Sequence, residues 1–240
     1  MKYLKLNRWN VTPREAAKIQ LQLRERLELI DRLPEVRYVA GADLAFDLAN
    51  TRAIAGVVVY RFPEMEEIER VWGESQIVFP YIPGLLSFRE APALLSVFRR
   101  VKNTPDLIFC DGHGYAHPRR FGITSHLGVL LDTPTIGCAK SLLVGTHDPV
   151  PLCAGKWTPL RDRDEIIGAV LRSRAGVNPI YITQGHRISL VTALNFVAAV
   201  LDGFRIPRPT RDADGFVGAA KRGEYGRRRR MESSNRSYGS

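Results

Sequence analysis

The chain has 240 residues, 45% of them hydrophobic, which suffices to bury a sizeable core in one large domain or two small ones. Its 35 basic and 25 acidic residues give a net charge of +10, which favours an anionic partner, with nucleic acid first and a membrane surface second. The 3 cysteines form no CxxC pair, so neither a disulfide framework nor a cysteine zinc site is favoured.

The first predicted element is a helix that begins at a capping box. Thr12 is the expected N-cap, Pro13 the first helical residue and Glu15 the reciprocal partner of the cap. Apolar residues continue at helical spacing to residue 30, and Pro34 is the expected stop. The predicted apolar face consists of Ala16, Ile19, Leu23, Leu27 and Ile30.

Three strand-like runs follow, over residues 36–46, 52–62 and 68–79. The short turns between them predict an antiparallel meander. A helix is then expected to begin near residue 90.

Strands and helical segments alternate in the rest of the chain. Residues 106–110 form a short apolar run before glycines, which is typical of a buried parallel strand. Residues 133–140 and 178–186 are predicted as two further strands, and residues 189–203 as an apolar helix. The order predicts an α/β fold, a mixed sheet with helices on both faces.

We expect residues 1–215 to form a single domain and residues 216–240 to form a tail. The tail carries seven basic residues against Glu224 and Glu232, and so contributes half of the net charge. Its apolar content is too low to pack, so we expect a disordered segment. Its arginines would either add non-specific affinity for nucleic acid or only solubilise the chain.

Neither the N-terminus nor any later segment suggests a membrane protein. The first residues, "MKYLKLNRWN", lack an apolar signal core, and no stretch approaches the ~20 apolar residues of a membrane span. Together with the unpaired cysteines, this favours a soluble cytoplasmic protein.

Three carboxylates occupy positions where an isolated charge would be unfavourable. Asp43 lies inside the apolar run "VAGADLAF", and Asp111 follows "LIFC", at the strand end where α/β sheets place ligands. Glu90 shares the apolar stripe of its predicted helix with Leu94, so it points toward the sheet. The structural alternatives are a salt bridge for Asp43, an Asp-Gly turn for Asp111 and a capping box with Ser87 for Glu90.

Pro92 disfavours that capping box, because a helix capped at Ser87 would place the proline where a backbone N–H is needed. Three converging hard oxygen ligands suit Mg²⁺, or Mn²⁺ in its place. Such ions promote phosphodiester hydrolysis by activating water and neutralising charge on the phosphate. A basic protein with these acids is predicted to be a nuclease.

Six motifs in order carry a resemblance to a known family: "VAGADLAFD", "PYIPGLLSFRE", "PDLIFCDGHGYAHPRRFGITSHLG", "TPTIGCAKS", "GHRIS" and "PTRDAD". Over about residues 10–215, the chain resembles the Endonuclease V family of deoxyinosine-directed nucleases. The resemblance implies a ribonuclease-H-like fold and a Mg²⁺-dependent DNA repair endonuclease. It further implies hydrolysis of the second phosphodiester 3′ to a deaminated base, leaving 3′-hydroxyl and 5′-phosphate ends.

The resemblance also implies roles for single residues. The metal-binding acids are Asp43, Glu90 and Asp111, and the further catalytic positions are Lys140, His117 and Asp214. A wedge that enters the duplex beside the displaced base is implied for Pro80, Tyr81, Ile82 and Pro83. The implied base pocket consists of Gly84, Leu86, Gly112, Gly114, Gly122, Ile123 and Leu143.

The wedge answers a question that the sequence itself raises. Two prolines brace a loop that carries exposed-looking apolar residues, and filling the gap left by an extruded base is a plausible use for the Tyr81 ring. Core filling is the alternative, and it suits Leu86 and Phe88 better than Tyr81. Arg119 and Arg120 are candidates for phosphate contact, with a solvated surface role as the alternative. His126 is expected to be a satisfied helix histidine.

The expected partner is DNA containing a deaminated base, and the expected state is a monomer. Two alternatives remain open at this point. The same fold and acids could serve an endoribonuclease acting on inosine in RNA, or a module that binds damaged nucleic acid without cutting it. The complete set of acids together with Lys140 argues against the binding module.

Overall fold

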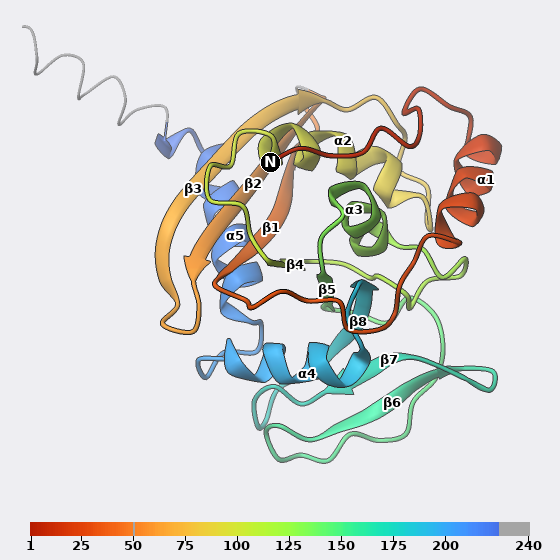
Figure 1. Cartoon of the computed structure of the whole chain (residues 1–240), viewed down its shortest axis with the longest axis vertical. Helices are drawn as coiled ribbons and strands as arrows, with labels where there is room; N and C mark the ends of the chain where they lie inside the picture. The colour runs from red at the N-terminus through yellow and green to blue at the C-terminus, as the bar shows by residue number, and fades with distance from the viewer. Residues whose placement is uncertain (50, 226–240) are drawn as a thin grey trace, which may run out of the picture.

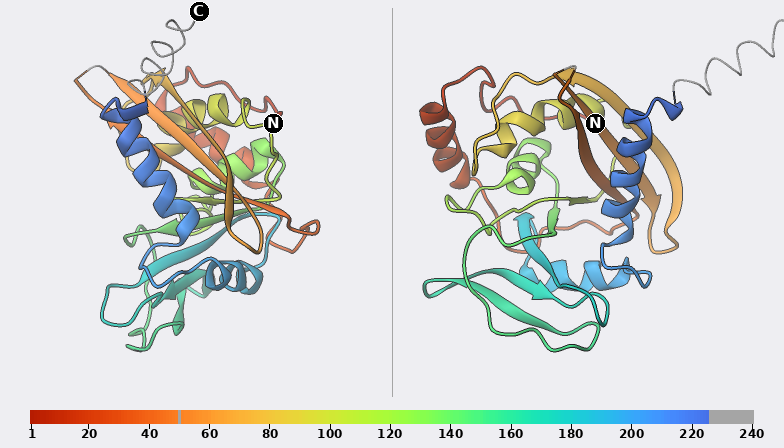
Figure 2. Two further views of the ribbon diagram at one scale, coloured as in Figure 1. Left: turned by 90° about the vertical axis from the view of Figure 1, so that its left-hand side faces the viewer. Right: turned by 180° about the vertical axis from the view of Figure 1, so that it is seen from behind.

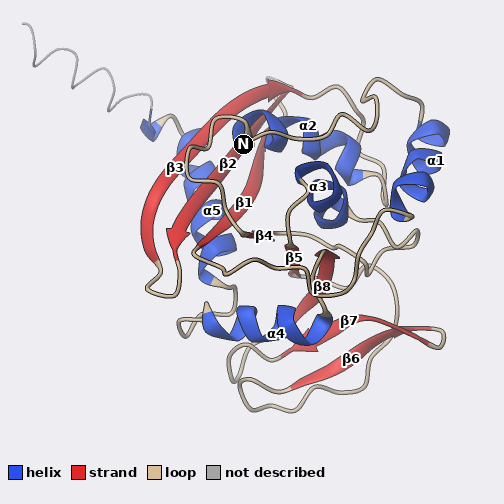
Figure 3. Cartoon of the chain, viewed as in Figure 1, coloured by secondary structure: helices blue, strands red, loops and turns tan. Residues whose placement is uncertain are grey.

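An eight-stranded mixed sheet forms the centre of the protein (Figures 1 and 3). The computed structural model describes residues 1–49 and 51–225. The strand order is β3-β2-β1-β4-β5-β8-β7-β6. In chain order the strands are β1 (Tyr38–Asp47), β2 (Arg52–Arg61), β3 (Glu66–Gln76), β4 (Leu107–Cys110), β5 (Thr135–Ala139), β6 (Trp157–Asp162), β7 (Glu165–Leu171) and β8 (Ile180–His186).

The sheet confirms both predicted kinds of pairing. Strands β1, β2 and β3 form the antiparallel meander, whereas β4 pairs parallel with β1 and β5. All four residues of β4 are buried, as expected for a strand covered on both faces. The remaining pairs, β5–β8, β8–β7 and β7–β6, are antiparallel.

Helices cover both faces of this sheet (Figure 2). On one face, α4 and α5 pack over a core that includes Tyr60 and Phe109. On the other, α2 and α3 pack over a second core that includes Ile108, and α1 lies outside α3. The helices are α1 (Pro13–Arg24), α2 (Leu86–Phe98), α3 (Ile123–Leu131), α4 (Leu190–Ala199) and α5 (Arg208–Lys221). None of the helices in the described ranges combines the length and apolar character that a membrane span requires.

Two predicted helix boundaries are wrong. The capping box of Thr12 and Glu15 is present, but α1 ends at Arg24 and Ile30 is 57% exposed. The chain leaves the helix there because the residues around Glu28 bond to the end of β8, where the Glu28 N–H donates to Nδ1 of His186 at 3.3 Å. Helix α2 begins at Leu86 and contains Pro92, four residues earlier than predicted.

The predicted tail boundary is also wrong, because α5 continues past residue 215. Phe216, Val217 and Ala220 are at most 5% exposed and pack against the sheet. Gly56 of β2 provides the space: a Cβ atom there would lie 2.5 Å from a methyl group of Val217. Three apolar residues at helical spacing therefore suffice to dock a segment whose overall composition is polar. The remaining predicted tail, residues 226–240, lies outside the described residues.

The hairpin of β6 and β7 was not predicted from the sequence. It forms one edge of the sheet, and its turn contains Arg163 with a φ of 58°. Trp157 and Ile166 are 43% and 45% exposed, so the hairpin lacks a clean alternation of buried and exposed residues. That alternation is the signal on which strand prediction depends.

Candidate active site

Two of the predicted acids lie side by side on neighbouring parallel strands, Asp43 within β1 and Asp111 directly after β4. Ala42 of β1 is the register partner of Cys110 of β4, and Asp43 and Asp111 are the residues that come next after these partners. Gly41 lies directly beneath the start of α5, where a Cβ atom would be 1.8 Å from the Pro209 carbonyl oxygen. Side chains alternate along a strand, so Asp43 faces the α5 side of the sheet.

A lysine and a third aspartate join this edge of the sheet. Nζ of Lys140, just after β5, lies 2.6 Å from Oδ2 of Asp111 and 3.9 Å from Oδ1 of Asp214 on α5. Asp214 lies within α5, which packs on β1. The structure thus brings Lys140, Asp111 and Asp214 together from three separate elements.

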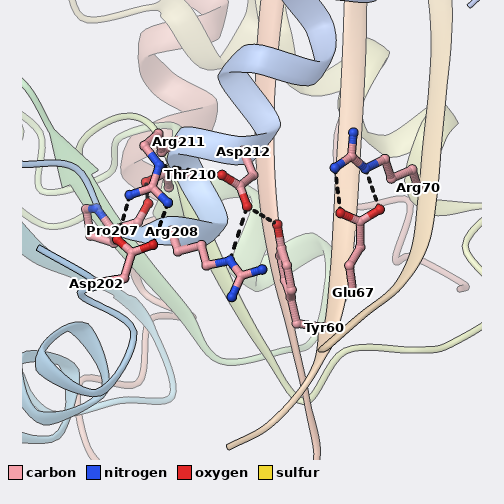
Figure 4. A network of polar contacts seen from close by, with 9 residues as sticks. All are labelled: Tyr60, Glu67, Arg70, Asp202, Pro207, Arg208, Thr210, Arg211 and Asp212. Atoms are coloured by element: carbon pink, nitrogen blue, oxygen red, sulfur yellow. Dashed lines mark hydrogen bonds and ion pairs between the residues drawn. The ribbon is translucent and has the colours of Figure 1, made fainter. Parts of the chain in front are cut away.

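A network of ion pairs fixes the helix that carries Asp214 (Figure 4). Arg211 makes two contacts of 2.6 Å with Asp202, in the loop before α5, and stacks over the Phe204 ring. Asp212 accepts a hydrogen bond of 2.7 Å from the hydroxyl of Tyr60, which is fully buried on β2. These contacts hold the first turns of α5 against the sheet, and with them the position of Asp214.

The carboxylates repel one another electrostatically. Burial and the negative charge of Asp111 raise the pKa of Asp43 to about 8. Burial and the same charge raise the pKa of Glu90 to about 7. Burial by itself would lower the pKa of Lys140, but the hydrogen bond and charge of Asp111 raise it, so the ammonium group stays charged. A cation among these acids would relieve the repulsion.

Hard carboxylate oxygens are the ligands that Mg²⁺ and Mn²⁺ prefer, so the donor set of Asp43, Glu90 and Asp111 fits such an ion. In this structure the three acids are not drawn together around one point. Within residues 1–49 and 51–225, no three acid, histidine or cysteine side chains lie close enough to hold a metal ion. The ammonium group of Lys140 occupies a place beside Asp111.

Glu90 lies in α2, on the same stripe as Leu94 and Phe98, which are almost fully buried. The capping-box alternative is excluded, because the N-cap of α2 is Leu85 and no side chain caps the helix. The guanidinium group of the preceding Arg89 donates to the carbonyl of Phe79 at 3.2 Å.

A pocket of about 400 Å³ separates the acids from the predicted wedge loop, residues 80–83. Ligand pockets typically measure roughly 300–1,000 Å³. Tyr81 is 67% exposed beside it, whereas Ile82 packs inward on a cluster that contains Phe79 and Phe88. Of the predicted site residues, the pocket is lined by Tyr81, Pro83, Gly84, Leu86, Glu90, Asp111, Gly112, His117, Gly122, Ile123, Lys140 and Leu143.

His117 contacts the loop and not the acids. Its Nδ1 accepts a hydrogen bond of 3.1 Å from the backbone N–H of Arg119, so the proton is on Nε2, which donates to the Gly84 carbonyl at 3.0 Å. Burial, followed by the charge of Arg119, lowers the pKa of His117 to about 4. His117 is therefore neutral at pH 7.

The two arginines predicted to contact phosphate already have protein partners. Arg119 donates to Oε1 of Gln20 at 2.6 Å and to the Gly84 carbonyl. Arg120 makes contacts of 2.7 Å with both Asp162 and Glu165. Both guanidinium groups thus tie protein segments together.

Gly114 does not line the pocket. It is buried against β8, where a Cβ atom would lie 2.1 Å from the carbonyl oxygen of Gln184, and its N–H donates to Thr183 at 2.7 Å. The lack of a side chain at Gly114 therefore lets the backbone approach strand β8 of the protein. Gly112, with a φ of +149°, does line the pocket.

Gln20 and His113 are among the pocket residues that were missed from the sequence. Gln20 is a polar residue on the buried face of α1, between Ala16 and Leu23, and this interruption of an apolar stripe is the signal that could have found it. His113 lies within "DGHG", where its Nε2 bonds the Ser141 carbonyl at 2.9 Å. His126 lies in α3 as predicted and is buried, with Nε2 3.1 Å from Oδ1 of Asn7. The prediction that it is fully satisfied is wrong, because its buried Nδ1 has no hydrogen-bond partner within the described residues.

A mixed sheet that presents acids and a lysine at the ends of its central strands, beside a pocket, is the arrangement of a ribonuclease-H-like nuclease. The family model described as Endonuclease V matches residues 21–215. The chain is 52% identical over 206 residues to Endonuclease V of Roseiflexus castenholzii, covering 86% of this chain and 92% of that protein. The chain belongs to the Endonuclease V family.

Solved structures agree with this assignment. The Endonuclease V of Streptomyces avermitilis superposes with a TM-score of 0.85 at 36% identity, covering 90% of this chain and 96% of its own. The Endonuclease V of Ciona intestinalis, in complex with a 24mer DNA containing an inosine followed by a ribo-adenosine, has a TM-score of 0.76 at 26% identity. It covers 87% of this chain and 97% of its own.

Proposed function

We propose that this protein is a Mg²⁺-dependent DNA repair endonuclease that recognises deoxyinosine and cuts the second phosphodiester bond on its 3′ side. The observation that carries the proposal is the placement of Glu90 and Asp111 in the wall of a pocket that Tyr81 borders. The acids proposed for hydrolysis and the tyrosine proposed for recognition of the lesion are therefore adjacent in this member of the Endonuclease V family. The inosine-containing DNA bound by the Ciona intestinalis relative supports the choice of substrate.

Asp43, Glu90 and Asp111 would hold the Mg²⁺ ion, and Mn²⁺ can replace it. When bound, such an ion supplies an activated water molecule and neutralises charge on the phosphate. Lys140 keeps a fixed positive charge 2.6 Å from Asp111, where it orients this carboxylate and attracts the phosphate backbone. Asp214, on α5, adds a further carboxylate near Lys140 at this edge of the sheet.

The pocket would receive the base after it leaves the helical stack. Gly84 and Gly112 leave room for a base to approach the backbone, and Leu86, Ile123 and Leu143 provide apolar walls. Tyr81 would occupy the gap in the duplex. Extrusion of a base costs a few kcal/mol, and less where pairing is already weak, so stabilising the gap favours damaged sites.

We further propose that the protein acts as a monomer. A reducing cytoplasm is the proposed location, in keeping with the free thiols of Cys110, Cys138 and Cys153.

The direct test is incubation of the protein with an end-labelled deoxyinosine duplex, with and without Mg²⁺, and mapping of the cut to one nucleotide. We expect one Mg²⁺-dependent cut at the second phosphodiester on the 3′ side. A matched undamaged duplex and a matched inosine RNA strand are the controls. Preferential cleavage of the RNA would instead support the endoribonuclease, and binding without cleavage would support the damage-binding module.

A further inference from the structure

Gly84 is the joint between the wedge loop and the helix that carries Glu90. It has a φ of +77°, a conformation that favours glycine, and α2 begins two residues later. The loop before it is braced by a hydrogen bond of 2.9 Å from the Leu85 N–H to the Ile82 carbonyl. A rotation at this joint would move Tyr81 relative to the pocket.

Three side chains converge on the carbonyl oxygen of Gly84. His117 donates at 3.0 Å, the Arg119 guanidinium group also donates, and Nε2 of Gln20 lies at 3.2 Å. A carbonyl oxygen has two lone pairs, so this acceptor is fully used. The joint is thus held by side chains from outside the loop.

Gln20 connects these partners to one another. It is 1% exposed, and its Nε2 also donates to the Phe121 carbonyl at 3.1 Å, while its Oε1 accepts from Nε of Arg119 at 2.6 Å. Both ends of the amide are therefore engaged. Because Gln20 comes from α1, its hydrogen bonds link that helix to the joint and to the segment before α3.

We propose that Gln20 is a positioning residue for base recognition, which holds Gly84 so that the wedge loop and the pocket keep one relative placement. This inference rests on the proposed function for its kinetic consequence. Gln20 contacts none of the acids in the hydrogen bonds of the described residues, so its effect falls on binding of the lesion and leaves the hydrolytic step intact.

The kinetic test compares Gln20→Leu with Leu23→Ala. Gln20→Leu keeps a similar volume but removes all three hydrogen bonds, whereas Leu23→Ala weakens the same face of α1 by removing contacts with Phe121 and Val129. For Gln20→Leu we expect kcat/KM on a deoxyinosine duplex to fall about tenfold, mainly through KM, and to fall clearly less on single-stranded deoxyinosine, which does not need the wedge loop. Leu23→Ala should lower Tm without changing the ratio of the two substrates.

Gln20→Glu tests the donor end and the acceptor end of the amide separately. The carboxylate can still accept from Arg119 but cannot donate to Gly84 or Phe121. We expect the same selective loss on the duplex as for Gln20→Leu. Wild-type kinetics for this folded variant, or equal losses on both substrates for both Gln20 variants, would overturn the proposal.

Amide hydrogen exchange tests the joint without any substrate. In both Gln20 variants, exchange in a peptide covering residues 79–88 should accelerate relative to wild type, and in Leu23→Ala it should not. Unchanged exchange in this peptide would overturn the proposed role. If the wild-type protein leaves deoxyinosine duplex uncut, the proposed function fails, and the exchange result still decides whether Gln20 holds the joint.

Discussion

The acid cluster, defined as Asp43, Glu90 and Asp111, and the wedge loop, residues 80–83, are held by different contacts. Both contribute to the wall of one pocket, the cluster through Glu90 and Asp111 and the loop through Tyr81 and Pro83. Asp43 lies within β1 and Asp111 directly follows its partner strand β4, so the backbone hydrogen bonds of the central sheet place them. The wedge loop is held at Gly84 by side-chain donors, including His117 and Gln20. The backbone hydrogen bonds between strands hold Asp43 and Asp111 in place although their charges repel. The wedge loop is held at Gly84 by a few side-chain hydrogen bonds, so it can move more easily. The comparison predicts that chemistry and recognition can be damaged separately.

The largest effect should come from the acid cluster. Asp43→Ala or Asp111→Ala should lower cleavage at least about 1,000-fold on every substrate, because metal-assisted charge stabilisation amounts to several kcal/mol. Without divalent cations at pH 9, Asp43→Ala should remain folded and melt at or above the wild-type temperature, because one repelling charge is gone. Asp111→Ala also loses the ion pair with Lys140, so it should melt below Asp43→Ala. Steady-state cleavage and a melting curve in a chelator measure both effects. Near wild-type turnover in Mg²⁺ would contradict the assignment of the ligands.

A smaller and selective effect is expected from the wedge loop. Tyr81→Ala removes a ring that is 67% exposed, so the fold should be unaffected. Base–aromatic stacking contributes ~1–3 kcal/mol, which corresponds to about 5- to 150-fold weaker binding of deoxyinosine duplex. A binding titration with Ca²⁺ in place of Mg²⁺ measures this, since its looser coordination should support binding with little cutting. Affinity equal to wild type would exclude the tyrosine from the interface.

Much of the acid cluster could be predicted from the sequence, because apolar runs with a single carboxylate at or near their end are a local signal. Asp43 and Asp111 were selected on that signal, and Glu90 because it shares the apolar stripe of its predicted helix. The meander and the parallel strand β4 were likewise predicted from turns and periodicity. The prediction of Asp214 as a site residue depended on the family resemblance, because Asp214 comes close to Lys140 only when α5 packs on β1.

The wedge joint could not be predicted in the same way. Arg119 and Arg120 were predicted either to contact phosphate or to be solvated, and the partners that they have in the structure lie on segments distant in sequence, such as Gln20 and Glu165. A guanidinium group that ties two protein segments and one that binds phosphate have the same local sequence. Long-range partners decide between the two roles, and a single sequence does not show them.

The repulsion within the acid cluster should appear as pH-dependent stability. The folded-state pKa values of Asp43 and Glu90 are raised to about 8 and about 7, so the folded chain binds more protons than the unfolded chain below these values. Stability should therefore fall as pH rises through this range. Histidines such as His117, whose pKa is lowered, are neutral in both states above about pH 7 and do not oppose the effect there.

In a chelator, we expect Tm to fall by about 2–4 °C between pH 7 and pH 9. Asp43→Asn should flatten this slope, and added Mg²⁺ should raise Tm more at pH 9 than at pH 7. Differential scanning calorimetry measures all three. A Tm that rises with pH in the wild-type protein would show that the acids do not repel one another.

The smallest effect on the specific reaction should come from the basic segment 226–240. Truncation after Tyr225 spares the buried residues of α5, unlike truncation at the boundary predicted from the sequence. If Arg227 to Arg230 contact phosphates, the slope of log affinity against log salt for undamaged DNA should fall by roughly four units, at about 0.9 per contact. The cut site should not move. An unchanged slope would assign these arginines to solvent.

The separation of recognition from chemistry is tested most directly by comparing Tyr81→Ala with Glu90→Gln on two substrates. The quantity is the ratio of kcat/KM for duplex deoxyinosine to kcat/KM for the same strand alone. Glu90→Gln should depress both substrates together and leave this ratio near its wild-type value. Tyr81→Ala should lower the ratio, because single-stranded deoxyinosine has less stacking to replace. Equal losses on both substrates for Tyr81→Ala would contradict the account and place the ring among the supports of the acid cluster.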